Sequence, residues 1–142
     1  MIRDIVRSEM FLRLPSEPAS ADDIPLAFDL LDTLAAHADE CVGMAANMVG
    51  ERKRVIVFDD EGTPRAMLNP VIVERAGRYE AREGCLSLDG TRPAARYRRI
   101  RVRFLEPTGD GETSLRQREE TFTGWMAQVI QHEVDHCDGV VI

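Results

Sequence analysis

The pattern H-E-V-D-H at residues 132–136 constrains the fold of this chain more than any other feature of its sequence. On a helix, side chains four positions apart lie on the same face. A helix through this pattern therefore presents both histidines to one metal ion and places Glu133 beside them as a candidate base. Residues 124–131 contain no proline and carry apolar side chains at helical spacing, and Gly139 is a suitable stop. The pattern predicts a metal-binding helix in this part of the sequence.

Two histidines do not complete a catalytic metal site, which usually takes three protein ligands and keeps one position open for water. The chain has three cysteines, and the odd number argues against a disulfide framework. We expect Cys85 to be the third ligand, because a thiolate suits a divalent transition metal and Gly84 lets the backbone come close to a ligand. Cys85 lies far from His132 in the sequence, so only the fold can bring them together.

Each feature also has a simpler explanation. The H-E-x-x-H pattern is short and occurs in helices that bind no metal. A single cysteine in a strand-like segment is more often a small buried side chain than a ligand. On the residues alone, both interpretations stay open.

Length and charge narrow the class of protein. A chain of 142 residues fits one compact domain, residues 1–142, that can bury a core without disulfides or a structural metal. The formal net charge of −7 argues against direct nucleic-acid function, since phosphate binding needs a basic surface. No apolar run reaches the length of a membrane span, and the first residues carry charges where a signal peptide needs an apolar core. We expect a cytoplasmic protein that does not act at a membrane.

The pattern of apolar residues predicts an α+β fold, with small antiparallel sheets packed around the central metal-binding helix. A first helix is expected at residues 22–37, with Asp22 or Asp23 as its cap and Pro25 in its first turn. Strands are expected at 53–58, 66–73, 78–85, 97–105 and 113–123, and turns at 59–62 and 107–111. The arginines of residues 92–103 fit the solvent face of an edge strand.

Three separated segments together resemble the three signature motifs of the peptide deformylase family. Residues 41–48, C-V-G-M-A-A-N-M, resemble the first motif, which usually reads G-x-G-L-A-A-x-Q. Residues 83–87, E-G-C-L-S, match the second motif at every position, and residues 131–136, Q-H-E-V-D-H, match the third. The order and spacing of the motifs agree as well, so the resemblance extends over roughly residues 10–142. It also implies the α+β fold described above.

This resemblance implies a metal site and a reaction. The metal ligands would be Cys85, His132 and His136, with Fe²⁺ as the implied ion, and this set of donors would also accept Zn²⁺, Ni²⁺ or Co²⁺. Glu133 would take the proton of the attacking water, and the backbone N–H of Leu86 would help to hold the oxyanion. The reaction would remove the formyl group from N-formylmethionyl peptides and release formate.

The resemblance also implies where the substrate lies. Contacts with it are expected at Gly43, Met44, Met48 and Gly84. The partner would be an N-formylated peptide or the N-terminus of a nascent chain, which implies proximity to the ribosome. Glu83 is expected to pair with Arg96 and so to fix the strand that carries the cysteine ligand.

Departures from the first motif bear on activity. Met48 stands where the family has a glutamine, and a thioether cannot donate a hydrogen bond to an oxyanion. Asn47 would compensate only if its side chain pointed the same way. Loss of one such donor has cost about 10²–10³ in rate in other enzymes. We therefore expect a slow deformylase, or one shifted towards another N-acyl group.

Several residues keep more than one interpretation. Asp135 orients a histidine, stabilises the turn after the helix, or is a plain solvated residue. Cys41, in place of the first glycine of the motif, is a packed small side chain, a site of inhibition by oxidation, or a second contact to the metal. Cys137 is expected to face the core, and His37 to end the first helix, where a cation suits the helix dipole.

Two other functions compete with deformylation. The H-E-x-x-H pattern alone would allow another metal-dependent amide hydrolase, such as a peptidase. The altered first motif would allow a weakly active or non-catalytic protein that keeps the fold to bind a peptide or a partner.

Overall fold

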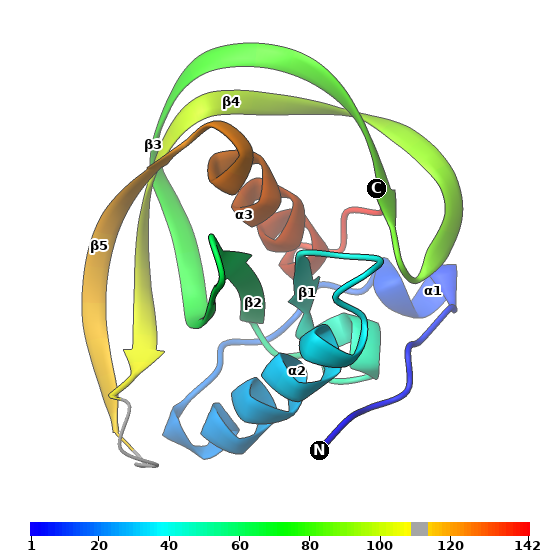
Figure 1. The fold of residues 1–142 in the computed structure, drawn as a ribbon, viewed down its shortest axis with the longest axis vertical. Helices are drawn as coiled ribbons and strands as arrows, with labels where there is room; N and C mark the ends of the chain where they lie inside the picture. Colours follow the sequence, from blue (N-terminus) through cyan, green and yellow to red (C-terminus); the bar gives the residue numbers. More distant parts are fainter. Residues whose placement is uncertain (109–113) are drawn as a thin grey trace.

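The computed structural model describes residues 1–108 and 114–142, and its core is an antiparallel sheet with two helices (Figure 1). In chain order the elements are α1 (Glu9–Leu12), the 3₁₀ helix η1 (Ala21–Asp23), α2 (Ile24–Ala36), β1 (Gly43–Ala45), the 3₁₀ helix η2 (Ala46–Val49), β2 (Val55–Asp60), β3 (Thr63–Cys85), β4 (Leu88–Pro107), β5 (Leu115–Thr123) and α3 (Gly124–Cys137). The α+β class expected from the sequence is confirmed.

The strands pair in chain order, β1-β2-β3-β4-β5, and each pair is antiparallel. β3 and β4 are long, with 23 and 20 residues, and they arch over α3 (Figure 1). Register shifts between Leu68 and Val71 and between Ile72 and Glu74 interrupt this pair, and such bulges bend a strand. The small sheets expected from the sequence are therefore joined, within the described residues, into one curved sheet that wraps the helix.

β2 lies between the two helices. Val55 and Val57 pack in the core cluster that includes α2, whereas Ile56 and Phe58 pack in the cluster that includes α3. All four side chains are fully buried, which explains the continuous apolar run in this strand. The core thus has two halves, one on each side of β2.

Local signals in the sequence explain the ends of these elements. Glu61 and Gly62 both have positive φ, 50° and 93°, as a two-residue hairpin turn between β2 and β3 requires. Pro25 lies in the first turn of α2, as predicted. The predicted cap differs, because Ser20 caps η1 and the Asp23 side chain accepts a hydrogen bond from the Ser20 N–H instead of capping α2.

Three expectations about strands need correction or fall partly outside the structure. The strands expected at 66–73 and 78–85 are one strand, β3, because β4 pairs with it along nearly its whole length. The arginine-rich segment is not at an edge: β4 lies between β3 and β5, and Arg96 is only 3% exposed. The expected turn at 107–111 and the start of the strand at 113 lie partly outside the described residues.

None of the helices in the described ranges is long and apolar enough to cross a lipid bilayer.

Candidate metal and active site

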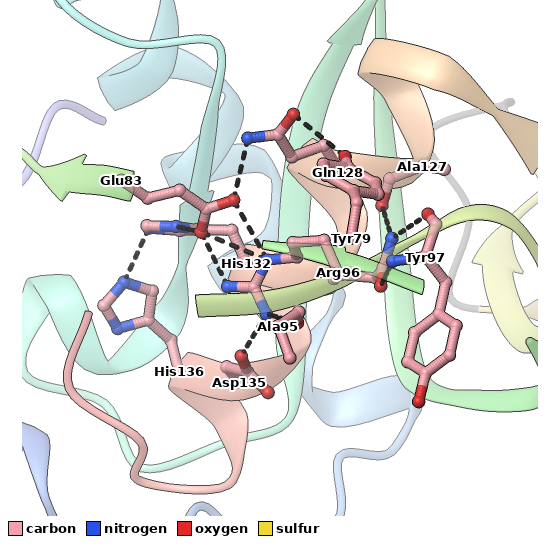
Figure 2. Close-up of polar contacts among 11 residues, drawn as sticks. Tyr79, Glu83, Ala95, Arg96, Tyr97, Ala127, Gln128, His132, Asp135 and His136 are labelled. Atoms are coloured by element: carbon pink, nitrogen blue, oxygen red, sulfur yellow. Dashed lines mark hydrogen bonds and ion pairs between the residues drawn. The ribbon is translucent and has the colours of Figure 1, made fainter. Parts of the chain in front are cut away.

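Cys85, His132 and His136 converge at one point between β3 and α3. One ligand atom from each residue lies within 4.8 Å of the other two. The Nε2 atoms of the two histidines are 3.1 Å apart, one helical turn from each other on α3 (Figure 2). The fold therefore brings together the three residues that the sequence predicted as metal ligands, which the spacing of the motifs alone could not establish.

The separation of the two histidine nitrogens fits a tetrahedral metal ion. Two imidazole nitrogens, each about 2.0–2.1 Å from a tetrahedral metal, lie about 3.3 Å from each other. The observed separation of 3.1 Å between the His132 and His136 Nε2 atoms is close to this value. Two imidazole lone pairs directed at the same point repel each other unless a proton or a metal ion lies between them.

The hairpin between β3 and β4 positions Cys85. Only Leu86 and Ser87 separate the two strands, and Cys85 pairs with Leu88 across the turn. The Ser87 N–H donates to the Cys85 Sγ at 3.4 Å. This hydrogen bond helps to hold the sulfur beside the two histidines.

Glu83 holds His132 from behind. Its Oε1 lies 2.9 Å from the His132 Nδ1, so this nitrogen carries the proton and Nε2 keeps its lone pair for a metal (Figure 2). Burial opposes ionisation of Glu83, but hydrogen bonds from His132 and Arg96 lower its pKa to about 2. Glu83 is thus a carboxylate that accepts hydrogen bonds at neutral pH.

Arg96 joins Glu83 to Asp135. Its guanidinium donates to both carboxylate oxygens of Glu83, at 2.6–3.1 Å, and its Nη1 donates to the Asp135 Oδ2 at 2.7 Å. The predicted Glu83–Arg96 pair is confirmed. Asp135 does not orient a histidine, since its side chain binds Arg96 and Glu83 lies at the His132 imidazole.

Two glutamines on α3 complete this polar region, and sequence reasoning missed both. Gln128 donates from Nε2 to the Glu83 Oε2 at 2.9 Å and accepts from the Tyr79 hydroxyl at 3.1 Å. Gln131 accepts from the Tyr97 N–H and donates to its carbonyl, each at 2.8 Å, so it fastens α3 to β4. Gln128 had a detectable signal: a glutamine four positions before His132 lies on the metal-binding face of the helix.

The charges around the two histidines suit a cation. Burial alone would lower the pKa of His132, but hydrogen bonds with Cys85 and Glu83 raise it to about 10. Burial, with the positive charge of His132, lowers the pKa of His136 to about 3. The two imidazoles together hold one proton strongly and cannot hold a second. This pair of nitrogens is suited to share one metal cation in place of that proton.

Glu133 is buried against β1 with one oxygen unpaired. Its side chain is nearly inaccessible, and its Oε1 has no hydrogen-bond partner among the described residues. Burial raises the pKa of Glu133 to about 7, which suits a group that takes and returns a proton near neutral pH. A Cβ atom on Gly43 would lie 3.0 Å from the Glu133 Oε2 and 2.9 Å from Val129, so only glycine lets β1 approach this closely.

A pocket of about 870 Å³ opens onto Cys85, His132 and Glu133. Of the expected substrate contacts and oxyanion donor, the pocket wall includes Gly43, Met48, Gly84 and Leu86. Met44 is different: its side chain is fully buried in the core with α2, so only its backbone can reach a substrate.

The first motif provides the opposite wall of the pocket. Met48 is 2% exposed, and its sulfur accepts a hydrogen bond from the Ala45 N–H at 3.5 Å. Asn47 does not replace the missing glutamine, because its amide donates to the carbonyl of His136 at 3.0 Å. This hydrogen bond joins η2 to the end of α3 and leaves the pocket without that donor.

The other cysteines are not ligands in this arrangement. Cys41 lines the pocket and lies outside the cluster of ligand atoms, and its sulfur is 3.7 Å from the carbonyl of His37. Burial raises the pKa of Cys41 to about 11, so the thiol is neutral at neutral pH. Cys137 faces the core, as predicted.

Comparisons with known proteins agree with this geometry. The family model described as "Polypeptide deformylase" matches residues 4–142. A curated peptide deformylase from Clostridium beijerinckii is 42% identical over 142 residues, which is the full length of both chains. The chain belongs to the peptide deformylase family. It is therefore a hydrolase that acts on formylmethionyl peptides, and the family and enzyme class predicted from the three motifs are confirmed.

Solved deformylases have the same fold. The peptide deformylase from Thermotoga maritima superimposes with a TM-score of 0.84 at 31% identity, over 99% of this chain and 94% of that one. A class I type b peptide deformylase from Acinetobacter baumannii with Met-Ala-Ser bound gives 0.84 at 27% identity, over 99% and 96%. These relatives do not favour a non-catalytic protein.

Proposed function

We propose that residues 1–142 act as a single-domain deformylase in which Cys85, His132 and His136 hold one divalent metal ion and Glu133 transfers the proton. The observation that carries this proposal is the convergence of the three ligand atoms within 4.8 Å beside a buried carboxylate oxygen that has no partner in residues 1–108 and 114–142. Structural pairs such as Arg96 and Glu83 saturate their hydrogen bonds, whereas the Glu133 oxygen is left available for a ligand.

Glu133 has the properties of a proton carrier. When bound, the metal ion would polarise the formyl carbonyl and lower the pKa of water in the open position. Glu133 accepts a proton from the attacking water and returns it to the departing amine, releasing formate and the free peptide. Its pKa of about 7 lets it do both near neutral pH.

The identity of the ion follows from donor chemistry. One thiolate and two imidazoles accept Fe²⁺, Zn²⁺, Ni²⁺ and Co²⁺, and the family resemblance favours Fe²⁺. Because an Fe²⁺–thiolate site is sensitive to oxygen, the native ion has to be identified in protein prepared without air.

The substrate would lie along β1. β1 is at the edge of the sheet, so a peptide can add to its free side through backbone hydrogen bonds. Gly43 and Gly84 line the pocket, and the N–H of Leu86 is the candidate oxyanion donor. The Met48 side chain forms part of the pocket wall but offers no hydrogen-bond donor.

The proposed substrate also assigns a place in the cell. N-formylated ends are produced when new chains start, so the enzyme would act in the cytoplasm on peptides or nascent chains close to the ribosome. The net charge of −7 argues that it meets the chain end rather than the ribosomal RNA.

Anaerobic metal analysis coupled to a formate assay tests the proposal. The purified protein should contain about one divalent ion per chain and release formate from a formyl-Met peptide, without cleaving internal peptide bonds. Glu133→Gln should keep the metal and lower the rate about 10²–10⁴-fold, the usual contribution of a positioned base. Internal cleavage would support a peptidase instead, and full activity of Glu133→Gln would remove Glu133 from the mechanism.

A further inference from the structure

A continuous series of hydrogen bonds runs from β3 to the proposed metal site. The Tyr79 hydroxyl binds the Gln128 Oε1 at 3.1 Å, and the Gln128 Nε2 binds the Glu83 Oε2 at 2.9 Å. The other carboxylate oxygen of Glu83 lies 2.9 Å from the His132 Nδ1 (Figure 2). Gln128 is thus connected to the metal ligand His132 through Glu83, and Tyr79 is connected to it through Gln128 and Glu83.

The chemistry of the groups fixes the direction of these bonds. Both Glu83 oxygens bind N–H groups of the Arg96 guanidinium, which can only donate, so Glu83 pairs as a carboxylate and only accepts. The amide of Gln128 must therefore turn its NH₂ group towards Glu83 and its oxygen towards Tyr79. The Tyr79 hydroxyl then donates, and each group has one consistent role.

Gln128 has a particular effect on the Glu83 carboxylate. Oε1 of Glu83 receives donors from both Arg96 and His132, at 2.6–3.1 Å. Oε2 receives only the Arg96 Nε, at 3.0 Å, and Gln128. Without Gln128, Oε2 would keep the Arg96 Nε as its donor, and this N–H also binds Oε1. The carboxylate plane would then be free to rotate about the Cγ–Cδ bond of Glu83.

The position of Gln128 connects this network to the substrate. Gln128 lies one helical turn before His132 on α3 and forms part of the pocket wall beside Glu133. An aliphatic side chain would fill the same space in the wall but could not bind Glu83. Packing alone therefore does not explain a glutamine here.

We propose that Gln128, held by Tyr79, is a positioning residue that fixes the plane of the Glu83 carboxylate and thereby the orientation and tautomer of His132. This inference depends on the proposed metal site, because its consequence is a better-oriented ligand. Partners of a metal-bound histidine typically change metal affinity or activity by about 10–100-fold, and Gln128 acts one step further away.

Metal release measures this role without an activity assay. Gln128→Met keeps the length and volume of the side chain and removes both hydrogen bonds. We expect the Co²⁺-loaded variant to release its ion to a chelator about tenfold faster, at the low end of such effects, with an altered visible absorption spectrum. Tyr79→Phe should speed release about threefold, since it removes one neutral hydrogen bond.

A double-mutant cycle tests whether Tyr79 acts through Gln128. In that case Tyr79→Phe adds nothing to Gln128→Met, and the double variant releases Co²⁺ as fast as Gln128→Met alone. Tyr97→Phe is the matched control, because within the described ranges the Tyr97 hydroxyl makes no hydrogen bond and only its backbone binds Gln131. Its release rate should equal that of the wild type.

The outcomes separate this inference from the proposed function. Stoichiometric Co²⁺ binding with an unchanged release rate and spectrum in Gln128→Met would overturn the inference and leave the metal site in place. Additive effects in the cycle would show that Tyr79 does not act through Gln128. Failure of the wild type to bind Co²⁺ at Cys85, His132 and His136 would overturn both.

Discussion

The two walls of the pocket are built in different ways. Behind His132, the side chains of Glu83, Arg96 and Gln128 are connected by hydrogen bonds from β3, β4 and α3. On the opposite side, β1 and η2 present mostly backbone and apolar side chains. There the side chains make few polar contacts. The Met48 sulfur accepts one N–H, and the side-chain oxygen of Asn47 has no partner in the part of the chain described.

This difference matches the distribution of departures from the family motifs. In a buried polar network each group depends on the others, because an unpaired polar atom in a low-dielectric interior is costly. Glu83, His132 and Asp135 belong to that network, and the motifs that contain them, at residues 83–87 and 131–136, match the family at every position. The wall formed by residues 43–49 makes few side-chain hydrogen bonds, so methionine can replace glutamine there without breaking a network, although a donor is lost.

Arg96→Met should have the largest effect on the networked wall. It leaves the Glu83 carboxylate buried without its main partner, and breaking a buried ion pair in this way costs about 3–5 kcal/mol. The free energy of unfolding, measured by urea denaturation of the metal-free protein, should fall by this amount.

Arg101→Met is the matched control for that change. Arg101 pairs with Glu119 on the outer surface, where both side chains are more than a third exposed. Exposed pairs contribute about 0.2–1 kcal/mol, so this variant should remain close to the wild type. Equal losses in the two variants would contradict the contrast between a buried network and a solvated surface.

Periodicity and motif spacing predicted much of this molecule but not the connections behind the ligands. The helix with His132 and His136 follows from the four-residue spacing, and Cys85 from its motif. The sequence offers Asp135, a neighbour of both histidines, as one candidate to orient a histidine. Asp135 lies three positions after His132 and points to Arg96, whereas the strand register brings Glu83 to the imidazole.

The course of β3 and the role of Asn47 show the same limit. The sequence suggested two strands, at 66–73 and 78–85, with a break between them. In the structure residues 74–78 are exposed and Gly77 has φ of 77°. The pairing with β4 keeps the strand continuous, and pairing is not encoded locally. The Asn47 contact with the His136 carbonyl likewise joins segments 89 positions apart, which no local pattern reports.

Met48→Gln tests the less connected wall and should have an intermediate effect. The new amide can donate where the thioether cannot, so formate release from a formyl-Met peptide should rise about tenfold. The gain should stay below the 10²–10³-fold cost of removing an oxyanion donor, because the pocket is not organised around the new group. Steady-state kinetics should show the change mainly in kcat.

Met48→Leu is the control on this wall. It keeps an apolar side chain of similar volume and has no donor, so formate release should stay close to that of the wild type. A rate increase in Met48→Leu equal to that of Met48→Gln would show that packing, and not a hydrogen bond, limits the reaction.

Asp135→Asn should have the smallest effect, although Asp135 lies between the two metal-binding histidines in sequence. Its carboxylate is partly exposed and its contact is with Arg96, which keeps the stronger partner Glu83. The loss in unfolding free energy should be within about 1 kcal/mol. Chelator-driven Co²⁺ release should match the wild type, because no imidazole loses a partner. If Asp135 oriented a histidine instead, release would accelerate about 10–100-fold, and Glu83 would not be the carboxylate that positions the metal ligands.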